Sequence, residues 1–403
     1  MIIKSIAICF AMAISACNQN EPDFTQPFPV GDFSQVELES AMLDFGFKAF
    51  YQINQTSEET ENILISPLSI ETALYMTNNG ALNETQREIT KTLELEDSHP
   101  DLVNLHYQSL ALQIREDATD ETFLNQSQAV FWSDLMHVDP EFRSKLENFY
   151  DADFRADQFD LESINGWAEE KTEGRIPKVL EEIQEDEVMF LLNALYFLGD
   201  WNVPFAPEGT IKKDFHIDDN ESLQVDMMHH DHPFHYYKGD DLNAVDLAFS
   251  EGKFAMTFIQ PTTDVNDFIG ENSFEEMSSI YESLIPRLTN ARLKLSLPKF
   301  ELEYKRNITE DLKALGMPKA FSENAELSGL GTAGGHIYLS RVLHDTYLKI
   351  DEKGAEGAAV TTVGVAAESL PPSISLDRPF LFVLRHVDSG VPIFIGKIMD
   401  PTK

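Results

Sequence analysis

Residues 354–367 constrain the fold of this chain more than any other stretch. They comprise only Gly, Ala, Val, Thr and a single glutamate, Glu356, with no proline, aromatic or long aliphatic residue. Surface loops usually carry Asn, Asp, Ser, Gly and Pro because those residues stabilise turns, whereas Val and Thr favour a pleated strand. The composition therefore predicts a strand-like segment that is held outside a sheet.

The same stretch divides cleanly into two faces. Successive side chains of a strand point to opposite sides, and one alternate set is small or β-branched and uncharged throughout: Ala355, Gly357, Ala359, Thr361, Val363, Val365 and Ala367. The other set holds both charges, Glu356 and Glu368. This pattern predicts a strand with one buried face and one solvated face. The alternative interpretation is a flexible Ala/Gly linker before the last hairpin.

Local signals predict several further elements. Ser66 can cap a helix that has Pro67 at its first position and stops near Asn79 and Gly80. Residues 188–197 form an almost wholly apolar run, which predicts a strand buried on both faces. Residues 380–385 and 391–397, joined by a turn at 388–390, predict a final hairpin.

The sequence in and around the small-residue stretch resembles that of a known protein family. DEKGAEGAAVTT, followed by SLPPSISLDRPF, resembles the hinge and reactive-centre loop of serpins, inhibitors that trap a protease by inserting this loop into their own central sheet. The hinge pattern is matched at Glu352, Gly354, Glu356, Ala358, Ala359 and Thr361. It is not matched at Ala355 and Gly357, but both are small and neither blocks burial.

Other segments extend the resemblance over nearly the whole chain. They include ISPLSIETALYMTNNGALNETQREI from Ile65 and NALYFLGDWNVPF from Asn193. The resemblance implies an α+β serpin fold with three β-sheets, about eight or nine helices and an exposed reactive-centre loop at about 354–376. We therefore expect a single domain over residues 36–403, although 403 residues alone would allow two or three.

The N-terminus predicts secretion. MIIKSIAICFAMAISAC carries Lys4 and an apolar run that is too short to span a bilayer, which is typical of a signal peptide over residues 1–16. Its end resembles the bacterial lipobox, in which cleavage leaves Cys17 as a lipidated N-terminus. Ordinary cleavage with an incidental cysteine is the alternative. Residues 17–35 are expected to form a polar tether that holds a secreted protein at the outer membrane or cell surface.

Charge and cysteine content exclude several classes of function. The formal net charge of −39 repels phosphates and heparin-like polyanions, so we expect neither nucleic-acid nor heparin binding. If Cys9 leaves with the signal peptide and Cys17 is lipidated, the mature chain has no thiol for a disulfide, a metal site or catalysis. No GxSxG, HExxH or P-loop pattern occurs. We expect a monomer without cofactor, metal or enzymatic activity of its own.

Two weaker patterns point elsewhere. His229, His230, His232 and His235, together with Asp231, have spacings that would suit zinc if they lay on a hairpin. The simpler interpretation of residues 229–235 is a solvated turn between strands. Gly329, Gly331 and Gly334 spell a dinucleotide-binding pattern, but a polar segment precedes it and a strand-like one follows, where a strand and then a helix are required.

The resemblance implies a reactive bond and a control region. It places the scissile bond between Glu368 and Ser369, which indicates a glutamyl-specific protease. Val365, Ala366 and Ala367 are alternative bait for elastase-like or subtilisin-like enzymes. Ser66, Ser69, Asn193 and His344 match the hydrogen-bonded "shutter" beneath the middle of the sheet. Trp201, Lys299 and Glu352 match the "breach" at its top, where a Lys299–Glu352 salt bridge is expected.

The implied function is inhibition of a serine-type endopeptidase by a metastable suicide substrate. The protease would be held as an acyl-enzyme after the loop inserts into the central sheet. Two alternatives stay open. The first is a non-inhibitory serpin-fold binding or chaperone protein, and the second is inhibition of cysteine proteases by the same loop mechanism.

Overall fold

The computed structural model describes residues 33–96, 98–119, 121–156, 158–218, 220–355 and 371–403. The expected signal peptide, Cys17, most of the tether and residues 356–370 of the loop lie outside the described residues, so the expectations for them stay predictions. No described helix combines the length and apolar character that crossing a membrane requires.

The described residues form nine α-helices. Capping residues at the N-termini explain why two of these helices begin where they do. Ser34 and Glu37 make a reciprocal capping box at the start of the first helix. The Ser66 hydroxyl caps the second helix by accepting from the Ser69 N–H, with Pro67 at its first position, which confirms the sequence prediction. The helices are α1 (Gln35–Thr56), α2 (Pro67–Asn78), α3 (Asn83–Thr92), α4 (Pro100–Glu116), α5 (Pro140–Tyr150), α6 (Leu161–Lys171), α7 (Val265–Glu271), α8 (Phe274–Leu284) and α9 (Thr309–Leu315).

The strands are grouped into one large sheet and three smaller ladders. They are β1 (Ile63–Ile65), β2 (Thr122–Trp132), β3 (Met136–Val138), β4 (Asp153–Arg155), β5 (Met189–Asp200), β6 (Ile211–His216), β7 (Ser222–Lys238), β8 (Leu242–Ala248), β9 (Phe254–Pro261), β10 (Thr289–Pro298), β11 (Phe300–Asn307), β12 (Gly331–Ala333), β13 (Leu343–Ile350), β14 (Gly354–Ala355), β15 (Ser373–Ser375), β16 (Phe380–His386) and β17 (Pro392–Ile398).

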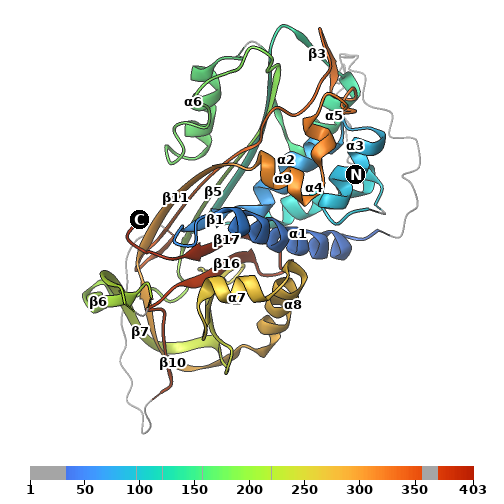
Figure 1. Cartoon of the computed structure of the whole chain (residues 1–403). Coiled ribbons are helices and arrows are strands. Elements are labelled where there is room, and N and C mark those ends of the chain that lie inside the picture. Colours follow the sequence, from blue (N-terminus) through green and yellow to red (C-terminus); the bar gives the residue numbers. More distant parts are fainter. Residues whose placement is uncertain (1–32, 97, 120, 157, 219, 356–370) are drawn as a thin grey trace, which may run out of the picture.

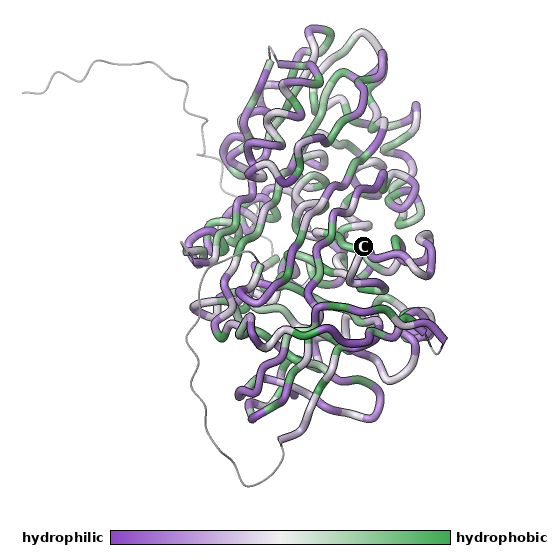
Figure 2. Tube along the Cα trace, turned by 90° about the vertical axis from the view of Figure 1, so that its left-hand side faces the viewer, coloured by the Kyte–Doolittle hydropathy of each residue, from purple (hydrophilic) through white to green (hydrophobic). Residues whose placement is uncertain are grey.

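The nine-stranded sheet has the order β1-β17-β16-β9-β8-β7-β10-β15, with β6 paired to β7. The predicted final hairpin, β16–β17, lies one strand in from the β1 end of this sheet, and every residue of its two strands is buried. The other ladders are β14-β5-β2-β4, β11-β13 and β12-β3. Figure 2 shows hydrophobic and hydrophilic positions interleaved along the long strands, as expected where strands have one face toward a core.

Helices cover both sides of the long strands. In Figure 1, α6 lies on one side of β5 and β11, whereas α2, α4 and α9 lie on the other. α1 packs against β17, α2, α4, α8 and α9, and so joins the helical group to the large sheet. The mixed helix and sheet architecture agrees with the expected α+β class. Among the described residues, β5 and β13 belong to separate ladders.

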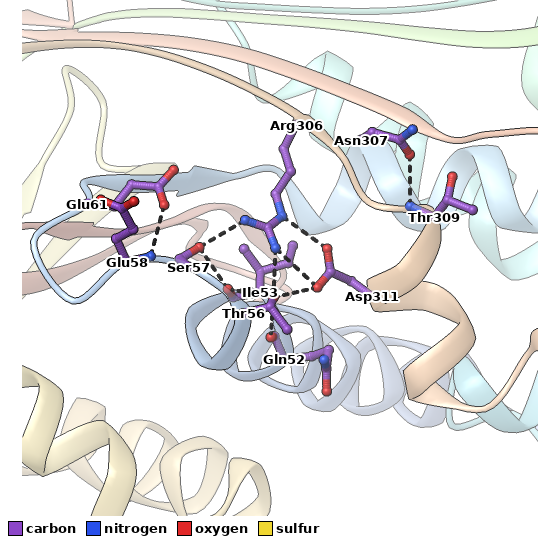
Figure 3. Close-up of polar contacts among 10 residues, drawn as sticks. All are labelled: Gln52, Ile53, Thr56, Ser57, Glu58, Glu61, Arg306, Asn307, Thr309 and Asp311. Carbon is purple, nitrogen blue, oxygen red and sulfur yellow. Dashed lines mark hydrogen bonds and ion pairs between the residues drawn. The ribbon is translucent and has the colours of Figure 1, made fainter.

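A buried ion pair fastens β11 to the neighbouring helices (Figure 3). Arg306 donates from Nε to Asp311 Oδ2 at 3.0 Å and from Nη1 to Ser57 Oγ at 3.0 Å. The Thr56 hydroxyl, at the end of α1, donates to Asp311 Oδ1 at 2.7 Å. The Asp311 side chain, on α9, is only 5% exposed. The β11–β13 pair is therefore anchored to α1 and α9.

Candidate functional site

The candidate site is the division between β5 and β13. β13 pairs with β11 along its whole length, and no ladder joins it to β5 within the described residues. Three residues after β13, the chain turns into β14, where Gly354 pairs with Asp200 and Ala355 with Gly199 in an antiparallel register. The rest of this edge of β5 has no strand partner among the described residues.

A cavity of about 170 Å³ lies beside this edge of β5. Its walls include Asn193 of β5, His344 of β13, Ser69 of α2 and Trp167 of α6. Protein interiors are normally packed as densely as organic crystals, so a void of this size between two strands marks a place where packing is incomplete. The arrangement can receive the side chains of a further strand.

Three of the four residues expected at the shutter, Ser69, Asn193 and His344, line this cavity, and the four form only part of a network. The Ser66 N–H donates to His344 Nε2 at 3.0 Å, and the Ser69 N–H donates to Ser66 Oγ at 3.2 Å. Burial lowers the pKa of His344 to about 4, so its ring is neutral and can accept this bond. Asn193 does not join them, because its side-chain oxygen and nitrogen are buried and have no partner in the described part of the chain.

The residues expected at the breach are in contact. Lys299 Nζ lies 2.8 Å from Glu352 Oε2, and the Thr210 hydroxyl donates to Glu352 Oε1 at 2.7 Å. Burial would raise the pKa of Glu352, but the bonds from Lys299 and Thr210 outweigh it and lower that pKa below its ordinary value. The carboxylate is therefore ionised at neutral pH, and the expected salt bridge is present.

Trp201 holds the segment between β13 and β14. Its ring Nε1–H donates to the Asp351 carbonyl at 3.1 Å, and its backbone N–H donates to the Lys353 carbonyl at 2.6 Å. Phe249 stacks on the indole with ring centroids 4.3 Å apart. Gly354 follows at φ +145°, where an added Cβ would lie 2.0 Å from the Gly199 carbonyl oxygen. Only glycine fits there, because L-residues with side chains avoid this backbone region.

Comparison with known proteins assigns the family. A family model described as "Serpin (serine protease inhibitor)" matches residues 40–401. The chain belongs to the serpin family. Alpha-1-antiproteinase of Rattus norvegicus is 28% identical over 411 residues, which cover 100% of this chain and 98% of that protein. The leukocyte elastase inhibitor of Xenopus laevis is 30% identical over 383 residues, with coverage of 90% and 99%.

Solved serpins share the fold. The thermophilic serpin tengpin, in its native state, superposes with a TM-score of 0.82 at 27% identity, covering 92% of this chain and 95% of its own. Human thyroxine-binding globulin superposes with a TM-score of 0.83 at 26% identity, covering 92% and 100%. Because the second protein is named for a hormone that it binds, membership of the family does not by itself identify an inhibitor.

Only part of the hinge that the sequence predicts lies within the residues that the structure describes. Glu352, Gly354 and Ala355 lie beside the C-terminal end of β5, at Gly199 and Asp200. The remaining hinge residues, Glu356, Gly357, Ala358, Ala359 and Thr361, lie outside the described residues. So do the predicted bond between Glu368 and Ser369 and the alternative bait at Val365, Ala366 and Ala367.

Sequence reasoning missed an ion-pair cluster at the opposite end of the serpin cavity. Arg341 donates to both carboxylate oxygens of Glu187, at 2.8 and 3.0 Å, and the Glu187 side chain is 1% exposed. The Tyr338 hydroxyl donates to Asp186 Oδ2 at 2.6 Å. These residues join the segment before β5 to the segment before β13. No local pattern signals the pairing, because more than 150 residues separate its members.

The histidine cluster does not form the expected turn or a zinc site. Residues 229–235 lie within β7, so strand alternation places His229 and His230 on opposite faces. Within the described residues, the only group spaced like metal ligands is Asp117, His386 and Asp388. Lys253 Nζ already lies between the two carboxylates, at 3.1 and 2.6 Å. The glycines at 329–334 enter β12, which pairs with β3 and does not open a helix.

Proposed function

We propose that this serpin inhibits a serine-type endopeptidase by acting as a suicide substrate. The observation that best supports the proposal is the pairing of Gly354 and Ala355 with the end of β5, above an edge that has no other strand partner among the described residues. A strand that continued from β14 would occupy this edge. Apart from Glu356, the next residues in the chain, up to Ala367, are small or β-branched and suit such a strand.

Extending the β14 register predicts where each loop residue would lie after insertion. Ala355 is 2% exposed, and the alternate residues beyond it would face the same buried side. Thr361 would then lie opposite Asn193, whose amide has no partner in the resting fold. A threonine hydroxyl can both donate and accept, so insertion would satisfy this buried group.

The proposed reaction uses the nucleophile of the protease. The serine hydroxyl oxygen of the protease bonds to the carbonyl carbon of Glu368, and the peptide bond to Ser369 breaks, with the proton passing to the new amino group. Glu368 then carries the protease as an ester. If residues 354–368 insert before water hydrolyses this ester, fifteen residues at about 3.3 Å each move the protease on the order of 50 Å.

The energy for this movement would come from the new strand. About a dozen added ladder hydrogen bonds, at roughly 1 kcal/mol each, give on the order of 10 kcal/mol. This is comparable to the stability of a whole domain. The resting fold would therefore be metastable, which requires a kinetic barrier. The breach contacts of Glu352 and Trp201 are suitably placed to contribute to that barrier.

The far end of the insertion would meet negative charge. In the extended register Glu368 lies opposite Asp186, which accepts a hydrogen bond from Tyr338 and neighbours Glu187. Like charges at this point oppose the last step of insertion. We therefore expect Asp186→Asn to raise the fraction of protease that is trapped. The measured quantity is the molar ratio of serpin to protease needed for full inhibition, which should fall. A ratio unchanged from that of the parent chain would contradict this register.

Target choice follows from the bait. Glu368 favours a glutamyl-specific protease, whereas Val365, Ala366 and Ala367 favour elastase-like or subtilisin-like enzymes. A name among the relatives, the leukocyte elastase inhibitor, supports testing the second class. We further propose that the chain acts as a secreted monomer, anchored at the cell surface or outer membrane through lipidated Cys17. Incorporation of labelled palmitate that Cys17→Ser abolishes is the expected result for that anchor.

Denaturing electrophoresis tests the inhibitory function. The purified protein is incubated with a glutamyl endopeptidase, with elastase and with subtilisin. We expect a covalent band near the summed masses of serpin and protease. Gly357→Arg should remove this band because its side chain would face the buried side near Phe197, whereas the matched variant Glu356→Arg faces water and should keep it.

Other outcomes of the same gel reassign the function. Cleavage by all three proteases without a covalent band would overturn inhibition and favour a non-inhibitory binding serpin. If a covalent band forms only in a parallel incubation with a cysteine protease, the result would favour inhibition of cysteine proteases.

A further inference from the structure

A basic pocket lies on the nine-stranded sheet where β6, β7, β10 and β15 meet. Its lining includes two lysines, a histidine and three serines: Lys213, Lys294, His229, Ser296, Ser373 and Ser375. They come from distant parts of the chain, and only the sheet register brings them together. No stretch of the sequence contains this cluster, which is unexpected in a chain with a net charge of −39.

The register places these groups on one face. Across the β7–β10 ladder, Ser296 pairs with His229. Across the parallel β10–β15 ladder, Ser296 pairs with Ser375 and Lys294 with Ser373. Directly paired residues point to the same side of a sheet. Hydroxyl, imidazole and ammonium groups therefore share the surface onto which the pocket opens.

The two lysines of the pocket lining outnumber its one carboxylate, Asp231, which lies directly across from Lys294. Neither Lys213 nor Lys294 forms an ion pair with a carboxylate among the residues that the structure describes. Asp231 also lines the pocket, but Arg292 donates to both of its oxygens, at 2.7 and 3.2 Å. The bond from Arg292 is the main cause that lowers the pKa of Asp231. Two exposed ammonium groups therefore remain available for a ligand.

His229 has a ring nitrogen that no described group contacts by a hydrogen bond. Its Nδ1 lies 2.8 Å from Ser296 Oγ, and its Nε2 is buried without a partner among the residues that the structure describes. Burial, and secondarily the charge of Lys213, lower the pKa of His229, so the ring is neutral. When the Ser296 hydroxyl donates to Nδ1, the proton lies on Nε2. A buried N–H that lacks an acceptor costs free energy, which a ligand oxygen would recover.

We propose that this pocket binds a small tetrahedral oxyanion, with phosphate and sulfate as the representative ions. Lys213 and Lys294 supply charge, and His229 Nε2–H and the hydroxyls of Ser373 and Ser375 supply hydrogen bonds. Donors from separate strands suit an acceptor with oxygens in several directions. The long-range repulsion from the acidic chain is screened beyond about 8 Å at physiological salt, so local donors decide binding.

A bound oxyanion would have a mechanical effect. Among the strands that the structure describes, β15 pairs only with β10 and lies at the end of the large sheet. It is also the first described strand after residues 356–370. An ion held jointly by Lys213 of β6 and the serines of β15 would tie that terminal strand to the body of the sheet. The inference is independent of protease inhibition.

Calorimetric titration with sodium phosphate at constant ionic strength, set by sodium chloride, tests the site. We expect a saturable signal with one ion per chain. Lys213→Ala and Lys294→Ala should each weaken binding at least tenfold. Lys212→Ala is the matched control, because Lys212 is the adjacent lysine and pairs with Asp226 at 3.1 Å, so its removal should leave binding unchanged. The absence of a saturable signal, or equal losses in all three variants, would overturn the proposal.

Hydrogen–deuterium exchange locates the ion. Phosphate should slow exchange in the peptide that contains Ser373–Ser375 in the parent chain but not in Lys294→Ala. Unchanged exchange in that peptide would contradict the assigned position. A lipid phosphate presents the same chemistry, so phosphatidic-acid vesicles form a second arm. Vesicle binding without binding of free phosphate would overturn the small-ion assignment, and the reverse result supports it.

Discussion

Acidification should weaken the fold through His344, and the size of the effect can be worked out from the structure. His344 is fully buried and accepts the Ser66 N–H, and burial lowers its pKa from 6.5 to about 4. The unfolded chain therefore binds a proton more readily than the folded chain between pH 6.5 and 4. Stability is lost as pH falls through this window. Since one pKa unit corresponds to about 1.4 kcal/mol, the full loss is about 3 kcal/mol.

A neighbouring carboxyl group acts in the opposite direction. Burial raises the pKa of Asp345 from 3.8 to about 6, so the folded chain takes up this proton more readily and gains stability over much of the same range. The pH dependence of the parent chain alone would mix the two effects. The informative quantity is the difference between the parent chain and His344→Gln, in which Asp345 is retained.

Urea unfolding measures this difference. Midpoints are recorded from pH 7.5 to 4.0 for the parent chain and for His344→Gln, with His216→Gln as the exposed control. We expect the parent chain to lose about 3 kcal/mol relative to His344→Gln across the range, and His216→Gln to follow the parent. Parallel curves for the parent chain and His344→Gln would refute the assignment of a buried, neutral His344.

Three further substitutions test the resting fold. Glu352→Lys removes the ion pair with Lys299 and should lower the free energy of unfolding by about 1 kcal/mol at this partly exposed site. The variant should also form polymers on heating, which size-exclusion chromatography detects. A variant that stays monomeric would contradict this expectation. Glu71 is fully buried, neither of its oxygens has a partner, and burial raises its pKa well above the ordinary value. Because the folded chain keeps the Glu71 carboxyl group protonated, its stability falls as pH rises. Glu71→Gln should therefore raise the melting temperature more at pH 8 than at pH 5. An equal rise at both pH values would refute a protonated Glu71. Arg306→Ala should cost about 3 kcal/mol in urea unfolding because it leaves Asp311 buried and uncompensated; a loss below 1 kcal/mol would show that water reaches Asp311.

Local signals were sufficient to predict individual elements. The cap at Ser66 and the following proline specify the start of α2, because both act within a few residues. The two apolar runs near the C-terminus specify β16 and β17 in the same way. The contact of Lys299 with Glu352 was expected only from the family resemblance, since no local rule joins positions that are 53 residues apart.

Features that depend on an absent neighbour were not predictable. The apolar run that forms β5 predicts burial on both faces, yet residues 189–193 are only partly buried. Their unpaired edge adjoins the cavity, and a sequence pattern reports which side chains can be buried but not whether the neighbouring strand is present. The pocket of Lys213 and Lys294 was missed for a related reason, because it depends on the register of four strands.

The two residues of β14 bear on the kinetics of the proposed insertion. Starting a new strand is slow when free chain ends must first find their register, because ordering the first residues costs entropy before any ladder forms. Here Gly354 and Ala355 already hold the register on Gly199 and Asp200. These two pairs would serve as the nucleus of the proposed insertion, and the new strand would then grow in one direction, from the upper end of β5 toward Met189. Under this scheme, substitutions near Ala355 would change how soon trapping begins, and substitutions near the far end would change how often it reaches completion.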